Sequence, residues 1–202
     1  MTIEKLTPMM EQYMSIKKDH PSEILFFRMG DFYEMFLQDA EIASRELEIT
    51  LTGRGTKGDG ERIPMCGIPY HAAQNYIGKL LSKGYRVAVC DQVENPAEAK
   101  GIVRREVTRI LTPGTLTDEA FLTQHRNNYL MVLTERDGRF GMCAADISTG
   151  ECLWGSYGGT SGKLTLYDDL FRLSPTEILC VPPFSSFEEI EGFCQQRLPK
   201  SL

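Results

Sequence analysis

The sequence predicts an α/β protein of the α+β type, in which a first domain with a mixed sheet is followed by a second, incomplete α/β domain. Strand and helix patterns alternate through the first part of the chain, up to Leu111. A turn sequence at 112–115 and a polar stretch beyond it then interrupt the hydrophobic pattern. After this break, three short strand patterns with tight turns precede one more helix and one more strand. Since 202 residues can form two cores, we expect domains over 1–116 and 128–202, joined by a linker over 117–127.

The first domain is expected to combine helices and strands in alternation. A helix is predicted where apolar residues recur every three or four positions, and a strand where a short apolar or alternating run lies between turn residues. Gly84 is expected to end the last helix as a C-cap. The predicted elements are helices over 8–18, 31–47 and 72–83, and strands over 24–27, 48–52, 85–90 and 103–111.

The helix predicted over 31–47 follows a break at Met29-Gly30. Asp31 occupies the N-cap position and Glu34 follows three residues later, which is an acidic version of the capping box. On pattern alone, Phe32 is therefore interpreted as the start of an apolar core stripe and Glu34 as a helix cap. The stripe has spacings of four, four, three and four, and consists of Phe32, Phe36, Ala40, Ala43 and Leu47.

Two loops rich in glycine or proline are expected after this helix. Gly53–Gly60 contains Arg54 and Lys57 but lacks the Gly-Lys-Ser/Thr ending of a nucleotide-binding loop, so it is expected to be a surface loop or a DNA backbone contact. Ile63–His71 holds two prolines and a glycine, which predicts a rigid extended loop whose backbone can approach a ligand. Because no nucleophile or carboxylate stands at a diagnostic spacing, His71 is interpreted as a hydrogen-bonding group at a helix start.

The second domain is expected to begin with three antiparallel strands. Asp137-Gly138 is a typical hairpin turn, and Ser148-Thr149-Gly150 joins the next two strands. The predicted elements are strands over 129–134, 139–147 and 150–156, a helix over 164–173 and a strand over 177–181.

The charge of the chain argues against strong non-specific binding to DNA. The net charge is -6, with 15 Lys+Arg against 16 Asp+Glu up to Thr115 and 7 against 12 after it. A module that binds a duplex mainly through phosphates would carry an excess of basic residues. Only Lys100–Arg109 is locally basic, and it is either a solvated strand face or a phosphate contact.

The cysteines and the chain start indicate a reduced, non-membrane environment. The six cysteines include no Cys-x-x-Cys pair and no nearby histidine cluster, so neither zinc nor a disulfide is expected. No signal peptide pattern and no run of transmembrane length occurs in the sequence. We expect a cytoplasmic, nucleoid-associated protein with no metal site.

Three motifs resemble the amino-terminal part of the MutS family of DNA mismatch-repair proteins. The similarity extends from Leu6 to about Asp118 and, more loosely, to Leu202. The motifs stand in the order and spacing of that family, which makes them far more specific together than singly. They are Gly30-Asp31-Phe32-Tyr33-Glu34-Met35-Phe36, Ile63-Pro64-Met65-Cys66-Gly67-Ile68-Pro69-Tyr70-His71 and Leu111-Thr112-Pro113-Gly114-Thr115.

The resemblance implies that the first domain recognises mispaired or unpaired bases in double-stranded DNA. In that family the Phe-x-Glu unit, here Phe32-Tyr33-Glu34, reads the mismatch from the minor groove. Its phenylalanine stacks on the mispaired base, and its glutamate forms a hydrogen bond to that base. The secondary candidates for DNA contacts are Met29, Gly30, Asp31, Tyr33, Arg54, Pro64, Met65, Cys66, Gly67 and Arg104.

The second domain resembles the ribonuclease H-like connector domain of the same family. That fold needs a further helix and strand, so we expect the domain to be truncated at its carboxy terminus. Ribonuclease H enzymes bind metal through several carboxylates, but no matching acidic set accompanies Asp146, which is therefore interpreted as structural. A metal-dependent nuclease is the enzymatic alternative, and a module that binds repair partners with little DNA binding of its own is the other.

The chain is not expected to be an enzyme. No Gly-x-x-x-x-Gly-Lys-Ser/Thr phosphate loop occurs in the sequence, and no catalytic residue or cofactor is expected. The resemblance implies that longer members of the family use ATP and Mg²⁺, form homodimers and bind MutL. The expected partner of this chain is mismatched double-stranded DNA.

Overall fold

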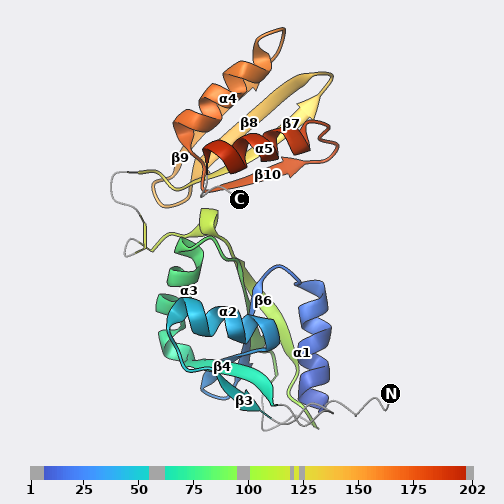
Figure 1. Ribbon diagram of the computed structural model, residues 1–202, viewed down its shortest axis with the longest axis vertical. Coiled ribbons are helices and arrows are strands. Elements are labelled where there is room, and N and C mark those ends of the chain that lie inside the picture. The colour runs from blue at the N-terminus through green and yellow to red at the C-terminus, as the bar shows by residue number, and fades with distance from the viewer. Residues whose placement is uncertain (1–6, 55–61, 95–100, 119–120, 123–125, 199–202) are drawn as a thin grey trace. The chain divides into compact units, whose positions relative to one another are not determined.

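The computed structural model describes residues 7–54, 62–94, 101–118, 121–122 and 126–198 (Figure 1). The chain divides into two compact units, Met1–Leu111 and Thr112–Leu202. The sequence-based limits differ from this division: they assign 112–116 to the first domain and 117–127 to a linker. The domain limits of 1–116 and 128–202 remain a proposal. Both units contain helices and a mixed sheet, so the predicted fold class is confirmed.

The first unit is built on a six-stranded sheet with the strand order β3-β4-β2-β1-β5-β6. Strand β1 pairs in parallel with β5, and the other neighbours pair antiparallel. The strands are β1 (Ile24–Met29), β2 (Phe32–Phe36), β3 (Thr52–Arg54), β4 (Ile63–Pro69), β5 (Val87–Gln92) and β6 (Arg105–Leu111). The helices are α1 (Pro8–Asp19), α2 (Leu37–Leu47), the 3-10 turn η1 (Tyr70–Ala72) and α3 (Ala73–Ser82).

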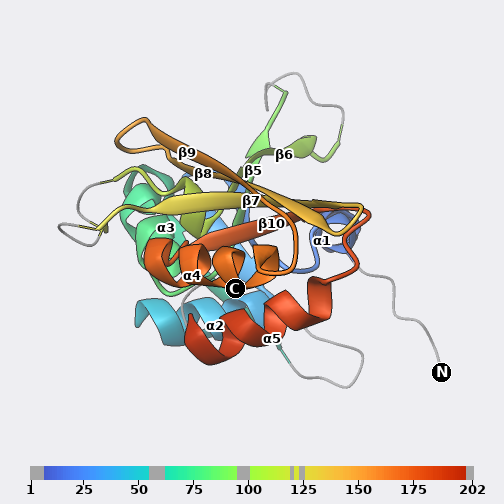
Figure 2. The same cartoon turned by 90° about the horizontal axis from the view of Figure 1, so that it is seen from above.

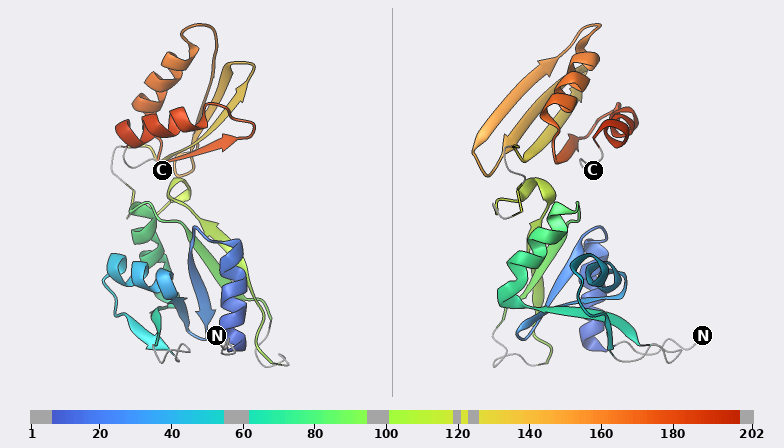
Figure 3. Two further views of the ribbon diagram at one scale, coloured as in Figure 1. Left: turned by 45° about the vertical axis from the view of Figure 1, so that its right-hand side comes forward. Right: turned by 60° about the vertical axis from the view of Figure 1, so that its left-hand side comes forward.

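Helices cover this sheet from both sides, as Figure 3 shows. Helix α1 packs on the face that carries Phe27 and Phe36, and the Tyr13 ring meets both rings edge-on at centroid distances of 5.5 and 5.0 Å. Alternation along β2 and β4 sends Cys66 to the opposite face, where its Sγ lies 3.5 Å from the Ala40 carbonyl oxygen of α2. The core therefore has two layers, with α1 on one side and α2 on the other.

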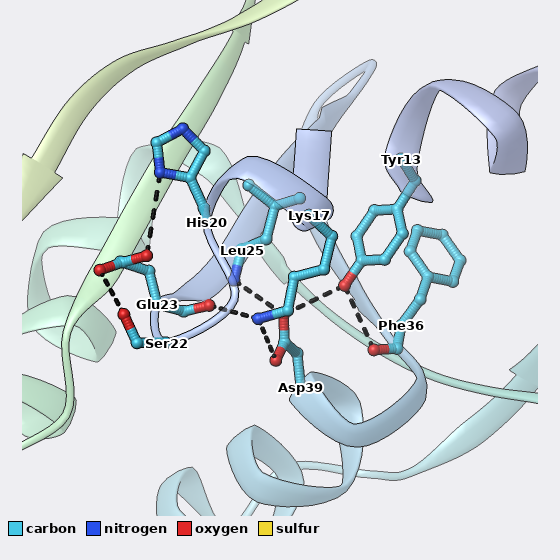
Figure 4. Close-up of polar contacts among 8 residues, drawn as sticks. All are labelled: Tyr13, Lys17, His20, Ser22, Glu23, Leu25, Phe36 and Asp39. Atoms are coloured by element: carbon cyan, nitrogen blue, oxygen red, sulfur yellow. Dashed lines mark hydrogen bonds and ion pairs between the residues drawn. The ribbon is translucent and has the colours of Figure 1, made fainter. Parts of the chain in front are cut away.

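A buried carboxylate joins α1, β1 and α2 (Figure 4). Oδ2 of Asp39 accepts hydrogen bonds from the Tyr13 hydroxyl at 3.1 Å and from the Leu25 amide at 3.0 Å, and Oδ1 accepts from Nζ of Lys17 at 2.9 Å. Burial, reinforced by the charge of Asp39, raises the pKa of the Tyr13 hydroxyl. The Tyr13 hydroxyl also donates to the Phe36 carbonyl oxygen at 3.3 Å. These bonds fix α1 over the Phe36 end of β2.

The predicted helix over 31–47 is wrong in its first third. Phe32–Phe36 is strand β2, and α2 begins only at Leu37. Met29 pairs with Phe32 across a two-residue turn in which Gly30 has φ +58°, a left-handed conformation that glycine adopts without strain. The spacing of four between Phe32 and Phe36 fits a strand as well as a helix, and the aromatic residues favour a strand. Asp31 is consequently a turn residue, not an N-cap.

Two further predictions in the first unit are corrected. The strand expected over 48–52 lies instead at Thr52–Arg54, because Glu48 takes a left-handed φ of 56° and ends α2. The rigid loop expected over Ile63–His71 is mostly strand β4, which pairs with both β2 and β3. Pro64 and Pro69 stand near its two ends, where a missing backbone donor is best tolerated. The rest of the loop expected over 53–60 lies outside the described residues.

The second unit is a four-stranded sheet in the order β10-β7-β8-β9, with β10 parallel to β7 and the other pairs antiparallel. Two helices lie on one face of this sheet (Figure 2). On the other face, the Trp154 side chain is 82% exposed. The elements are the turn η2 (Pro113–Thr115), β7 (Tyr129–Arg136), β8 (Arg139–Asp146), β9 (Glu151–Tyr157), α4 (Gly162–Leu173), β10 (Glu177–Val181) and α5 (Phe187–Arg197).

Most other predicted elements are confirmed, with small shifts at their ends. They are the helices expected over 8–18, 72–83 and 164–173 and the strands expected over 24–27, 85–90, 103–111, 129–134, 139–147, 150–156 and 177–181. Among the described residues, none of the helices has both the length and the apolar character needed to cross a membrane.

Candidate nucleic-acid interface at the hairpin

The β1–β2 hairpin presents Phe32 at its turn. Phe32 pairs with Met29 at the start of β2, next to the Gly30-Asp31 turn, and its side chain is 48% exposed. A Cβ built on Gly30 would have no atom within 4 Å, so the turn stands open on that side. The Asp31 carbonyl oxygen accepts from the Tyr70 amide at 2.9 Å, which ties the turn to η1.

Burial changes sharply along one face of β2. Phe32, Glu34 and Phe36 point to the same face because alternate residues of a strand do so. Phe36 is fully buried, the Glu34 side chain is 16% exposed, and Phe32 is about half exposed. Phe36 packs in the core cluster with Met10 and Tyr13 of α1, and Phe32 is outside that cluster. The Phe32 end of this strand therefore offers an aromatic ring and a carboxylate side by side.

Glu34 is held by an arginine from another strand. Nη1 of Arg54, at the end of β3, donates to Oε2 of Glu34 at 2.6 Å. Glu34 stands opposite Gly67 of β4, which carries no side chain to separate the two charged groups. Within the part of the chain that the structure describes, Arg54 is the only side chain bonded to this carboxylate.

Two arginines support the hairpin next to its turn. Nε of Arg105 donates to the Arg28 carbonyl oxygen at 2.6 Å, Nη1 donates to Oε1 of Gln12 at 3.0 Å, and the guanidinium lies 4.9 Å from the centroid of the Phe27 ring. Burial lowers the pKa of Arg105. The Arg28 guanidinium lies 3.7 Å from the centroid of the Tyr70 ring. These contacts link the strand next to the turn to β6, α1 and η1.

The secondary candidates fall into two groups. Gly67 is exposed, whereas Met29 and Met65 are half-buried and pack on the core cluster under α1. The side chains of Tyr33 and Cys66 are buried, and burial followed by the charge of Asp39 raises the pKa of the Cys66 thiol to about 12. Only the backbone of these two residues could meet a ligand.

The remaining candidates contact residues other than Phe32 and Glu34. Pro64 is half-buried and pairs with Gly53 on the edge strand. Arg104 is exposed and lies 3.5 Å from Glu106, an ion pair that does not involve the hairpin. The ring of His71 meets Tyr70 edge-on at 5.9 Å and has no hydrogen bond to any described residue, so its expected capping role is not supported.

Asp146 is a structural carboxylate, as the sequence predicted. It is 1% exposed and accepts hydrogen bonds from the Asn128 amide at 3.0 Å, the Ser148 amide at 2.9 Å and the Ser148 hydroxyl at 2.6 Å. Burial by itself would raise the pKa of Asp146, but these hydrogen bonds outweigh it and lower that pKa. Within the described ranges, no three metal-binding side chains gather at one place.

Sequence reasoning missed Arg105 and the partner of Glu34. Arg105 was expected only as part of a basic stretch, although alternation along a strand means that one of two successive arginines faces inward. The Glu34–Arg54 contact joins residues 20 positions apart through the pairing of three strands. No local pattern predicts such a register.

Comparison with known proteins places both units in one family. A family model described as MutS domain I matches residues 7–120, and one described as MutS domain II matches residues 128–201. The DNA mismatch repair protein MutS of Pelotomaculum thermopropionicum is 53% identical over 189 residues, which are 94% of this chain and 21% of that protein.

Two further curated relatives carry the same name, DNA mismatch repair protein MutS. That of Desulforamulus reducens is 53% identical over 185 residues, covering 91% of this chain and 21% of the relative. That of Acetivibrio thermocellus is 52% identical over 194 residues, covering 95% and 22%. The chain thus spans about a fifth of the length of the curated relatives it matches.

Proposed function

The chain belongs to the MutS family of DNA mismatch repair proteins, and from this premise we propose that it recognises mispaired or unpaired bases in double-stranded DNA. In this proposal Phe32 enters the minor groove and stacks on the mispaired base, while Glu34 forms a hydrogen bond to that base. The chain acts as a binding module and carries out no chemistry of its own.

The half-exposed Phe32 ring on a braced hairpin is the observation that carries the proposal. A ring can enter a base step only where unstacking is cheap, and a mispaired step opens and bends more easily than a paired one. A rigid wedge loses little conformational freedom on binding, so more of the stacking energy remains as affinity. The bonds of Arg105 and Tyr70 to the hairpin backbone supply that rigidity.

Glu34 contributes by a different physical effect. A carboxylate near the phosphates repels the duplex unless a base donates a hydrogen bond to it. An ionised Glu34 accepts from a base N–H, whereas a base that offers only a ring-nitrogen acceptor requires Glu34 to hold a proton. Glu34 therefore repels a correctly paired duplex, and a hydrogen bond from a mispaired base offsets this repulsion. Specificity then comes from weaker binding of the wrong partner.

The decisive experiment compares binding of the 202-residue chain to G·T-mismatched and matched duplexes of the same length. Phe32→Ala should reduce the mismatch preference by about 1 to 3 kcal/mol, the usual contribution of stacking a base on an aromatic side chain. Phe187→Ala is the matched control, because Phe187 lies in the other unit and is 49% exposed, against 48% for Phe32. A native chain that binds both duplexes equally, or a Phe32→Ala variant that keeps the preference, would refute the proposal.

Glu34→Gln and the salt dependence test the electrostatic part. Removing the charge should tighten binding to both duplexes and narrow the ratio between them. The salt dependence should be shallow, with a log-log slope weaker than about -5, because few phosphates are neutralised. Equal weakening on every duplex would instead mark Glu34 as a residue that only supports the fold.

One observation favours a second function, protein binding by the other unit. The open face of its sheet carries Trp154, 82% exposed, together with the half-exposed Leu179 and Val181. Exposed apolar groups of this kind often mark protein interfaces. If this face is an interface only, Trp154→Ser should leave DNA binding unchanged.

A further inference from the structure

Arg54 engages the carboxylate that the proposed function places against DNA. Its Nη1 lies 2.6 Å from Oε2 of Glu34, and the two side chains are 44% and 16% exposed. No described residue donates to Oε1 of Glu34. Among the described residues, Oε2 of this carboxylate has a partner and Oε1 has none.

The sheet directs this contact. Among the described strands, β3 pairs with β4 alone, and Arg54 stands opposite Ile63 there while Glu34 stands opposite Gly67. The arginine must therefore lean along β4 to reach the glutamate. A Cβ at Gly67 would lie at an ordinary contact distance of 3.6 Å from Cγ of Glu34, so this position of β4 lies directly beside the Glu34 side chain. An arginine suits this reach because its planar fork fixes the direction of the bond to a carboxylate.

We infer that Arg54 is a specificity-determining residue, which orients Glu34 through Oε2 and leaves Oε1 to accept a hydrogen bond from a mispaired base. This inference rests on the proposed function. Arg54 also offsets the charge of Glu34, so the duplex meets a dipolar pair rather than a bare carboxylate. An arginine already bonded at 2.6 Å is poorly placed to serve as a separate phosphate contact.

The readout that separates these two roles is the ratio of affinities for mismatched and matched duplex. A phosphate contact changes both affinities alike and leaves the ratio unchanged, because phosphates carry no information on base pairing. A residue that orients Glu34 changes the ratio, and does so only while Glu34 is present. The stability loss should be small, because the arginine of this ion pair is 44% exposed and ion pairs open to solvent contribute little to the free energy of unfolding.

The test is a double-mutant cycle of Arg54→Gln, Glu34→Gln and their combination. Arg54→Gln should reduce the mismatch ratio about three-fold or more when Glu34 is present, which lies within the coupling range of contacting residues. It should leave the ratio unchanged in the Glu34→Gln background. Arg54→Lys should give an intermediate ratio, because it keeps the charge but loses the fork. Arg45→Gln, which breaks the Arg45–Glu46 pair on α2, is the control and should change nothing.

Two results would overturn the inference while the proposed function stands. One is an equal effect of Arg54→Gln on the ratio in both backgrounds. The other is no effect on the ratio in either background. Both results require a native chain that prefers mismatched DNA.

A measurement without DNA adds a third check. The Nε–H resonance of Arg54 in isotope-labelled chain should shift on Glu34→Gln, and an unchanged resonance would show that the pair does not form. A native chain with no preference would overturn both proposals.

Discussion

The two ends of β2 place the same kind of side chain on the same face and give it opposite surroundings. Phe36 is fully buried under α1, where the Tyr13 ring and hydroxyl meet it, whereas Phe32 is 48% exposed beside the turn. Phe36 belongs to the core cluster under α1, and Phe32 does not. One strand can therefore anchor the fold at one end and present a ligand-binding ring at the other.

Of the substitutions considered, Phe36→Ala should lower the free energy of unfolding the most. A small loss would contradict the contrast between Phe36 and Phe32. Removing a fully buried phenylalanine costs about 3 to 5 kcal/mol of the free energy of unfolding, because the transfer free energy is lost and a cavity remains. Urea denaturation of the variant measures this cost. A loss below about 1 kcal/mol would mean that α1 does not pack on Phe36 as described.

Alkaline pH should produce the second-largest loss of stability, through two buried cysteines of the first unit. Burial, opposed by Arg105, raises the pKa of the Cys90 thiol to about 12, and burial with the charge of Asp39 raises that of Cys66 to about 12. Above pH 9 these thiols ionise in the unfolded chain but stay protonated in the folded one. Stability is then lost as pH rises from about 9 to about 12, by up to about 1.4 kcal/mol per pH unit for each thiol.

Denaturation at pH 8 and pH 10.5 checks this pH dependence. A Cys90→Ala variant should lose less stability between the two values than the native chain does, because it has one fewer group to titrate. Equal losses in both proteins would show that Cys90 is not protected by the fold.

Phe32→Ala should have a small effect on stability, about 1 kcal/mol or less, although it removes the same ring as Phe36→Ala. Thermal melting of the two variants side by side gives the contrast directly. If both variants lost similar stability, Phe32 would belong to the core, and the interpretation of Phe32 as a wedge would fail.

Trp154→Ser should have the smallest effect on stability and on mismatch preference. It tests whether exposure of an aromatic ring is enough for a role in DNA binding. Trp154 is more exposed than Phe32, yet it stands on an open sheet face beside Cys143 rather than at a braced turn. Its replacement should change stability by about 0.5 kcal/mol or less and leave the mismatch preference intact. A loss of preference would show that exposed aromatic rings act on DNA regardless of their support.

The sequence predicted the second unit better than the hairpin, for a physical reason. The strands of the second unit alternate and are separated by turn residues such as Asp137-Gly138, so local pattern determines them. In the hairpin, aromatic residues at spacings compatible with both a strand and a helix leave the choice open. Pairing of β2 with both β1 and β4 settles it, and the β2–β4 pairing joins segments that are separated in the chain by α2 and β3.

The candidate site was predictable only in part. Phe32 and Glu34 were identified through the resemblance of their motif, since their residue types alone suggested a core stripe and a cap. The Arg54–Glu34 pair depends on the register of three strands. The contact of Arg105 with the Arg28 carbonyl oxygen depends on which face of the sheet the Arg105 side chain points to. Neither is encoded within a short window of sequence.

The pairing of β1 has a consequence for how the first unit folds. β1 meets β2 across a two-residue turn, but it meets β5 in parallel, with Phe27 opposite Cys90. Closing that second contact requires a long intervening loop, and contacts of this kind slow folding because chain entropy is lost before they are rewarded. The hairpin can therefore form early while β5 joins late. We expect the refolding rate to respond to substitutions at the β1–β5 seam more than to changes at the Phe32 turn.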